Sequence, residues 1–136
     1  MSDKKLLVVF GATGVQGGSV INSVLGDPKT AETFKIRGVT RDTSKDAAKA
    51  LVSRGVEVVA VSNSKDVSNV VSKYKDKRLL TRAPQANTDD KESLRGAIKG
   101  AYAVFSLTNF WDHMDPVRER TQGINVADVA AVSTLK

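Results

Sequence analysis

The chain has 136 residues, 40% apolar and 26% charged, which fits one ordinary globular domain. It has no cysteine and one histidine, which excludes disulfides, cysteine-ligated metals and a histidine-rich metal site. The formal net charge is +6, but residues 61–85 hold six basic and two acidic side chains. Because most of the excess charge belongs to that segment, the composition does not predict a surface that binds nucleic acid directly.

The first expected element is the continuous apolar run Leu6–Phe10, which is typical of a strand buried on both faces. Five residues are too few for the core of a signal peptide or for a membrane span, and no later run is longer. We therefore expect no membrane partner and a cytoplasmic or nuclear location.

A glycine-rich segment follows, with the spacing GxxGxxG at Gly11, Gly14 and Gly17. It opens a stretch of helical periodicity that ends at 26–28, where a glycine precedes Asp-Pro. Glycines between a buried strand and a helix allow a tight turn, close approach of a pyrophosphate to the backbone and close packing of helix on strand. The N–H groups at the start of the helix then face the phosphates. We expect nucleotide binding here; the alternative is a glycine-rich turn without a ligand.

The rest of the chain alternates between expected strands and helices. Strands are expected at 34–39, 56–60 and 101–107, and helices at 44–53, at 89–100 and from about residue 115 toward the C-terminus. Such alternation implies right-handed βαβ crossovers. The predicted fold is therefore α/β, a Rossmann-type parallel sheet in the order 3-2-1-4 with flanking helices.

The end of the second strand bears on the choice of nucleotide. A site for NAD usually places a carboxylate there to accept a hydrogen bond from the ribose 2′-hydroxyl, whereas this chain has Thr40 and Arg41. A guanidinium pairs well with a 2′-phosphate, so NADP is expected in preference to NAD. Asp42 is an imperfect NAD candidate, Lys45 offers a weaker phosphate contact, and the alternative for Arg41 is a solvated loop charge.

Thr108 and Asn109 follow the fourth strand and are expected to border the nicotinamide side of the site. Phe110 and Trp111 either line the nicotinamide side of the site or pack under a loop. His113 is expected to be a loop residue. No catalytic residue is assigned. A reductase pair would have a lysine four residues after a tyrosine, but Arg78 stands four residues after Tyr74 and Ser106 four residues after Tyr102. No metal-ligand cluster is visible either.

Several of these segments together closely resemble the NmrA-like family, an atypical branch of the short-chain dehydrogenase/reductase superfamily. The segments that carry the resemblance are 11–20, 39–42, 55–59, 89–94, 100–105, 108–111, Glu119 and 122–130. The resemblance implies that the pyrophosphate is held by Gly11, Thr13, Gly14, Val15, Gln16 and Gly17. It also implies that Arg41 reads the 2′-phosphate and that Thr108 and Asn109 border the nicotinamide.

Regulatory members of this family lack the usual catalytic tyrosine and sense the redox state of the dinucleotide. The resemblance therefore favours an NADP-binding redox sensor that regulates transcription negatively through a protein partner, a transcription regulator. The alternative is an NAD(P)H-dependent oxidoreductase of the isoflavone-reductase-like or quinone-reductase-like type. A test for hydride transfer from NADPH to a quinone distinguishes the regulator from the oxidoreductase.

Family members are about twice as long as this chain, so residues 1–136 are expected to form only the N-terminal portion of an NAD(P)-binding NmrA-like domain. Residues 61–85 interrupt the family pattern as an insertion. Val61-Ser62, Leu80-Thr81 and Gln85 are compatible with codons that contain intron signals, and removal of the segment restores the pattern. We expect a retained intron; the alternative is a genuine insertion loop.

Overall fold

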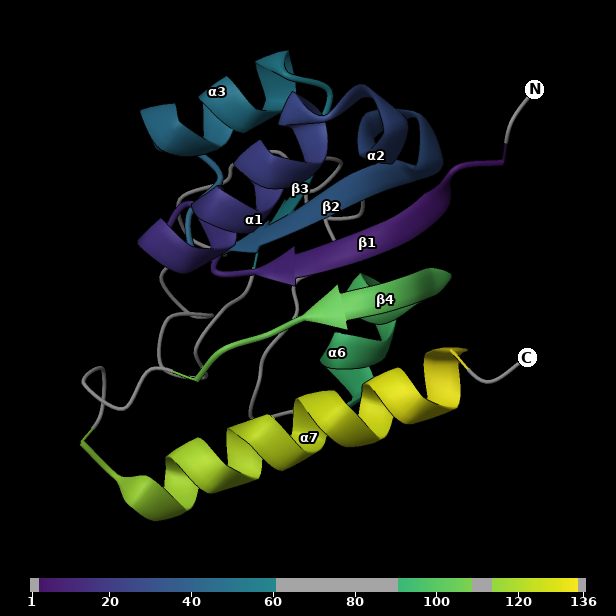
Figure 1. Ribbon diagram of the computed structural model, residues 1–136. Helices are drawn as coiled ribbons and strands as arrows, with labels where there is room; N and C mark the ends of the chain where they lie inside the picture. Colours follow the sequence, from purple (N-terminus) through teal and green to yellow (C-terminus); the bar gives the residue numbers. More distant parts are fainter. Residues whose placement is uncertain (1–2, 61–90, 109–113, 135–136) are drawn as a thin grey trace, which may run out of the picture.

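Four parallel strands form one sheet in the computed structural model, which describes residues 3–60, 91–108 and 114–134. The spatial order is β3-β2-β1-β4, as predicted from the sequence. The strands are β1 (Lys5–Phe10), β2 (Phe34–Thr40), β3 (Glu57–Ala60) and β4 (Ala101–Phe105). The arrowheads of β1, β2 and β4 point to the same side (Figure 1). We call the side on which the strands end the carboxyl edge.

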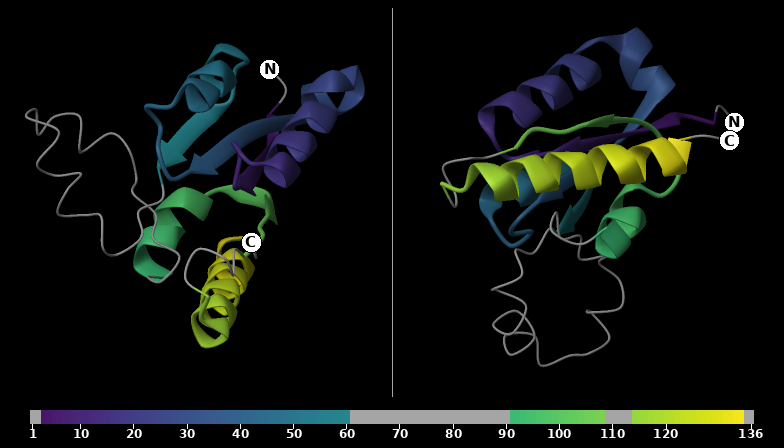
Figure 2. Two further views of the ribbon diagram at one scale, coloured as in Figure 1. Left: turned by 90° about the vertical axis from the view of Figure 1, so that its left-hand side faces the viewer. Right: turned by 90° about the horizontal axis from the view of Figure 1, so that it is seen from below.

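Helices cover both faces of the sheet (Figures 1 and 2). Those on one face are α1 (Val15–Gly26), α2 (Pro28–Thr33) and α3 (Asp46–Ser53). Those on the other face are α6 (Lys91–Ile98) and α7 (Pro116–Thr134). Strand β4 is two residues shorter at its carboxyl end than expected, and the segment 61–85 lies outside the described residues.

The short helix α2 was not predicted, because Pro28 was interpreted only as the end of the preceding helix. Proline also fits the first turn of a new helix, and here it opens α2 directly after Asp27, whose carboxylate accepts the N–H of Lys29 at 3.1 Å. The hydroxyl of Thr30 donates to the carbonyl of Val24 at 2.7 Å, which fixes α2 to the end of α1. Two helices thus join β1 to β2 where one was expected.

The two faces of β1 serve two separate apolar cores. Leu6, Val8 and Phe10 belong to the core under α6 and α7, whereas Val9 belongs to the core under α1 and α3. Val8 and Val9 are both 0% exposed, which confirms that the early apolar run is a strand buried on both faces. Burial of a side chain of this size stabilises the fold by about 1.5–3 kcal/mol relative to exposure.

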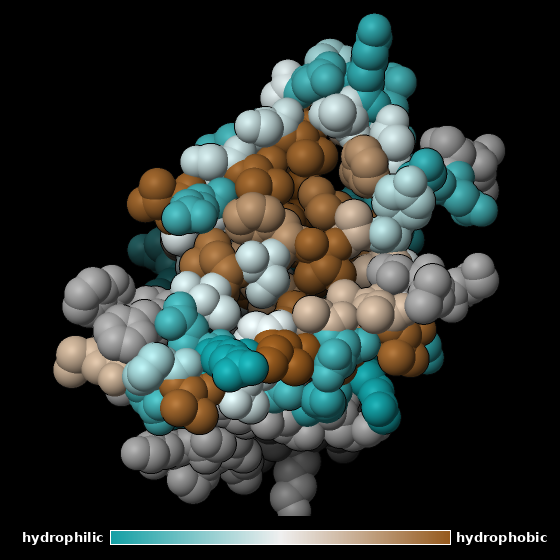
Figure 3. Space-filling view, turned by 60° about the horizontal axis from the view of Figure 1, so that its bottom comes forward, coloured by the Kyte–Doolittle hydropathy of each residue, from teal (hydrophilic) through white to brown (hydrophobic). Residues whose placement is uncertain are grey.

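Strand β4 forms one edge of the sheet and pairs with β1, with a register shift where Tyr102 is passed over. Apolar side chains gather in the middle of the face shown in Figure 3. Among the described residues, the partly buried apolar side chains packed against the core under α1 and α3 include Leu7, Val20, Val24 and Phe105. No helix in the described part of the chain is long and apolar enough to cross a membrane.

A charged side chain, Arg37 of β2, joins three elements on the α6 side of the sheet. Its Nη1 donates to the carbonyls of Ala97 and Lys99 at 2.8 and 3.1 Å, at the carboxyl end of α6. Its Nε donates to the carboxylate of Glu57 in β3 at 3.0 Å. A guanidinium at this position complements the helix dipole and satisfies carbonyls that have no partner within the helix.

We expect Arg37→Met to lower the free energy of unfolding by about 2 kcal/mol, because hydrogen bonds from a charged, largely buried donor are lost. The matched control is Lys91→Met, which removes the exposed ion pair with Asp128 (2.8 Å). That variant should cost at most about 0.5 kcal/mol. Urea unfolding of both variants checks this, and equal losses would show that Arg37 does not stabilise the sheet against α6.

Candidate functional site

The turn between β1 and α1 lies at the carboxyl edge and is held by two backbone hydrogen bonds. The N–H of Ala12 donates to the carbonyl of Val39 in β2 at 3.1 Å, and the N–H of Gly14 donates to the carbonyl of Gly11 at 2.9 Å. Gly11 has φ of +64°, in the left-handed region that glycine adopts without strain. We call residues 11–17, which include the first turn of α1, the glycine loop.

Gly17 brings helix and strand into unusually close contact. A Cβ atom at this position would lie 2.2 Å from the carbonyl oxygen of Gly11 and 3.0 Å from that of Phe10. Both atoms belong to the backbone and cannot rotate away. A Cβ at Gly14 would lie 3.2 Å from the same Gly11 oxygen, which is also tight. The sequence spacing is therefore explained by geometry: Gly11 has a positive φ, and a side chain at Gly14 or Gly17 would press on the Gly11 carbonyl.

Three amide groups at the start of α1 have no hydrogen-bond acceptor among the described residues: those of Val15, Gln16 and Gly17. The first amide to bond within the helix is that of Gly18, which donates to the carbonyl of Gly14 at 2.9 Å. The residue before the helix is Gly14, which has no side chain to cap these donors. Unpaired N–H groups and the positive end of the helix dipole make this terminus suited to an anion.

Thr13 and Thr40 connect the glycine loop to the end of β2. Their hydroxyl oxygens lie 3.4 Å apart, a long contact for a hydroxyl pair, and Thr40 is buried. The next residue, Arg41, is exposed and follows β2 directly. Because β1 and β2 are neighbours, with Phe10 paired to Val39, the glycine loop and Arg41 leave the same edge of the sheet side by side.

Asp42, the imperfect candidate for contacting the ribose of NAD, accepts hydrogen bonds within its own turn. Its Oδ1 accepts the N–H of Ser44 at 2.8 Å and the hydroxyl of Ser44 at 2.5 Å. Lys45 is exposed and immediately precedes α3. From the sequence, Ser44 was expected only to begin the helix 44–53, which instead starts at Asp46. An acidic residue two positions before a serine is nevertheless a recognisable turn signal.

Thr108 reaches the carboxyl edge from β4, on the opposite side of β1 from Arg41. Its hydroxyl donates to the carboxylate of Glu119 in α7 at 2.6 Å, so in this structure it is already paired. The side chain of the adjacent Leu107 lies against Gly11, 3.7 Å from where a Cβ would be. This links the segment after β4 to the glycine loop. Asn109, Phe110, Trp111 and His113 lie outside the described residues.

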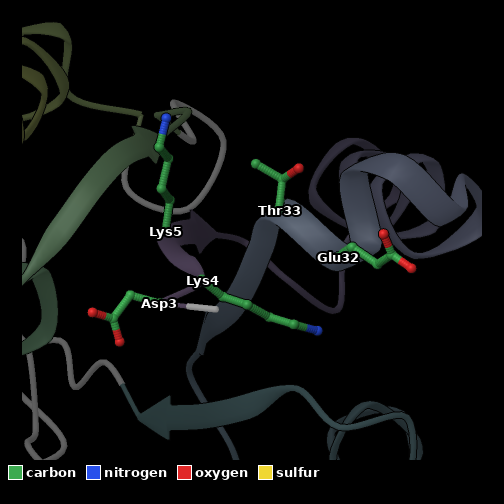
Figure 4. A pocket seen from close by; sticks show the side chains of 5 residues that line it. All are labelled: Asp3, Lys4, Lys5, Glu32 and Thr33. Carbon is green, nitrogen blue, oxygen red and sulfur yellow. The ribbon is translucent and has the colours of Figure 1, made fainter. Parts of the chain in front are cut away.

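A hollow of about 480 Å³ lies at the opposite, amino edge of the sheet and is lined by Asp3, Lys4, Lys5, Glu32 and Thr33. Figure 4 shows these side chains pointing in different directions. The Nζ of Lys4 donates to the carbonyl of Ala31 at 2.8 Å, and that of Lys5 lies 4.4 Å from the centre of the Tyr102 ring. Both ammonium groups thus serve local packing, and the carboxyl edge remains the candidate site.

Within residues 3–60, 91–108 and 114–134 there is no group of three acidic, histidine or cysteine side chains that could hold a metal ion. The carboxyl edge of the sheet brings three features together. Open amides lie in the middle, an exposed guanidinium follows β2 on one side, and a threonine follows β4 on the other.

Comparison with known proteins gives a consistent match along the chain. The model of the NmrA-like family matches residues 3–134. The NmrA-like family domain-containing oxidoreductase notA' of Aspergillus versicolor is 29% identical over 99% of this chain and 31% of its own length. The NmrA-like family domain-containing oxidoreductase FrzB of a Cladobotryum species is 43% identical over 96% of this chain and 32% of its own length.

Among solved structures, the NADPH-dependent quinone oxidoreductase QOR2 of Escherichia coli, complexed with NADPH, superposes with a TM-score of 0.58 at 20% identity. The match covers 96% of this chain and 34% of that protein, and at this identity it shows the shared fold. The chain therefore spans about a third of the length of each of these three proteins.

We expect Gly17→Ala to destabilise the fold by about 3 kcal/mol or more, because the added methyl group meets backbone carbonyls that cannot move aside. The matched control is Gly18→Ala, one residue further along the same helix, where a Cβ would lie at an ordinary 3.7 Å from the carbonyl oxygen of Ala12. This control should gain about 0.5–1 kcal/mol from helix propensity. Thermal unfolding checks both, and similar effects at the two positions would contradict the close packing at Gly17.

Proposed function

The chain belongs to the NmrA-like family, and we propose on that basis that its glycine loop binds the pyrophosphate of a nicotinamide dinucleotide. The observation that carries this proposal is the set of three amides, of residues 15–17, that lack an acceptor among the described residues. Each phosphate of a pyrophosphate needs several donors, and a helix N-terminus without a capping side chain supplies them without displacing an existing bond.

The residues proposed to hold the pyrophosphate are Gly11, Thr13, Gly14, Val15, Gln16 and Gly17. Their fit to the group rests on the glycines. Gly11 and Gly14 add no side-chain atoms to the turn, so at these two positions only the backbone is presented to a ligand. When bound, the dinucleotide would accept or donate a hydride, and the protein would supply orientation and electrostatic complementarity.

We propose NADP or NADPH in preference to NAD. The exposed Arg41 leaves β2 next to the glycine loop, where the adenosine ribose of a dinucleotide lies in folds of this type. A guanidinium offers a 2′-phosphate two parallel hydrogen bonds and a full positive charge. Thr108 and Asn109 are proposed to border the nicotinamide half, because β4 lies on the other side of β1.

For the protein as a whole we propose an NAD(P)H-dependent oxidoreductase that passes hydride to an organic acceptor, of which a quinone is the first to test. Support comes from relatives named as oxidoreductases and from the fold shared with the NADPH-dependent quinone oxidoreductase of Escherichia coli. This favours the alternative of the sequence analysis over its first choice, the regulator.

The second candidate is the redox-sensing regulator, which binds NADP and a transcription regulator without turning over a substrate. This candidate rests on the resemblance to the regulatory members of the family, and within these 136 residues neither Tyr74 nor Tyr102 has a lysine four residues later. The two candidates share the dinucleotide site and differ in whether hydride leaves it.

We expect Arg41→Ala to weaken NADP binding about ten- to a hundredfold and to leave NAD binding nearly unchanged, because the lost contact is made to the 2′-phosphate alone. The control is Arg54→Ala, which removes an exposed guanidinium at the end of α3 that is bonded to Asn22 at 2.8 Å. Isothermal titration calorimetry with both nucleotides measures the effect. Equal losses for NADP and NAD would show that Arg41 does not read the 2′-phosphate.

An assay of NADPH oxidation by a quinone distinguishes the two candidate functions. The reaction is monitored through the loss of absorbance of the reduced nicotinamide. An oxidoreductase should consume NADPH in proportion to protein concentration. The control is Arg41→Ala at subsaturating NADPH, which should be slower because less cofactor is bound. Tight binding of NADPH without any turnover of a panel of quinones would instead favour the regulator.

A further inference from the structure

The turn that follows β2 carries a specific pair of side chains, Asp42 and Ser44. Both hydrogen bonds of Ser44, from its N–H at 2.8 Å and its hydroxyl at 2.5 Å, end on the same oxygen, Oδ1 of Asp42. The aspartate is thereby drawn along the chain toward α3, which begins at Asp46. Ser44 thus controls the direction of the one carboxylate in the segment that joins Arg41 to Lys45.

This direction matters because Asp42 is the carboxylate closest in sequence to the position that recognises the adenosine ribose. A site for NAD uses such a carboxylate as an acceptor for the ribose 2′-hydroxyl. A carboxylate oxygen has about two acceptor positions, and those of Oδ1 are already taken by Ser44. Two donors on one oxygen also offset part of its negative charge, which would otherwise repel a 2′-phosphate near Arg41.

We propose that the Asp42–Ser44 pair is a specificity determinant of the dinucleotide site: Ser44 holds the Asp42 carboxylate in the turn, away from the ribose, and so favours NADP over NAD. This inference rests on the proposed function. Arg41 supplies attraction for the 2′-phosphate, and the pair occupies one oxygen of a competing acceptor for a 2′-hydroxyl and weakens a nearby repulsive charge. In this role Ser44 and Asp42 are positioning residues, since neither needs to contact the nucleotide.

Ser44→Ala tests the inference, because it removes the hydroxyl bond and releases one acceptor position of Asp42 while the backbone bond can remain. The ratio of NAD affinity to NADP affinity, measured by calorimetry, should rise about three- to tenfold, the value of one hydrogen bond. The matched control is Ser53→Ala, at the other end of α3, whose hydroxyl donates to the carbonyl of Ala50 at 2.7 Å. It should leave the ratio within about twofold.

Asp42→Asn is the second variant, because an amide oxygen can still accept from Ser44 but carries no charge. We expect about threefold tighter NADP binding through reduced repulsion, with NAD affinity within about twofold of the wild type. A loss of NAD affinity of about tenfold would overturn the inference, because it would mean that Asp42 reads the ribose. An unchanged ratio in Ser44→Ala would overturn it as well. If the wild-type chain binds neither nucleotide, the failure lies in the proposed function itself.

Discussion

The contact of Gly17 with the carbonyl of Gly11 determines where the candidate site lies. A methyl group would reach to 2.2 Å from that oxygen, so the first turn of α1 can rest on the end of β1 only with glycine at this position. That contact places the start of the helix at the carboxyl edge, against the end of β1, one of the two central strands. The close packing thereby fixes where the open amides of residues 15–17 lie, and the proposed pyrophosphate site lies with them.

Most of the fold could be predicted from the sequence because its signals are local. The apolar run 6–10 and the alternation of strands and helices determine a parallel sheet, and the handedness of crossovers leaves few possible orders. The observed order β3-β2-β1-β4 confirms the prediction. Helix α2 was not predicted because Pro28 is compatible with both the end of one helix and the start of another. Only the Asp27 cap and the Thr30 hydrogen bond decide between these two positions.

The site was predictable to the level of its position and less so in its detail. The glycine spacing and Arg41 could be located from sequence because each follows directly from a strand end. The pairing of Thr108 with Glu119 could not, since it joins segments on two different elements and depends on how α7 packs. The bonds between Ser44 and Asp42 depend on a turn conformation that the residue types allow but do not require. Residues 61–85 and Asn109 lie outside the described part of the chain, so the expectations about them stay predictions.

The central claim is that the glycine loop at the carboxyl edge binds a dinucleotide, and amide chemical shifts of the labelled wild-type chain test it most directly. On titration with NADP, the account predicts that the largest shifts occur at the amides of residues 13–17, with further shifts at 41–44, and that Lys4 and Glu32 at the amino edge stay unchanged. Saturating shifts confined to the amino edge, or none at residues 13–17, would contradict the account.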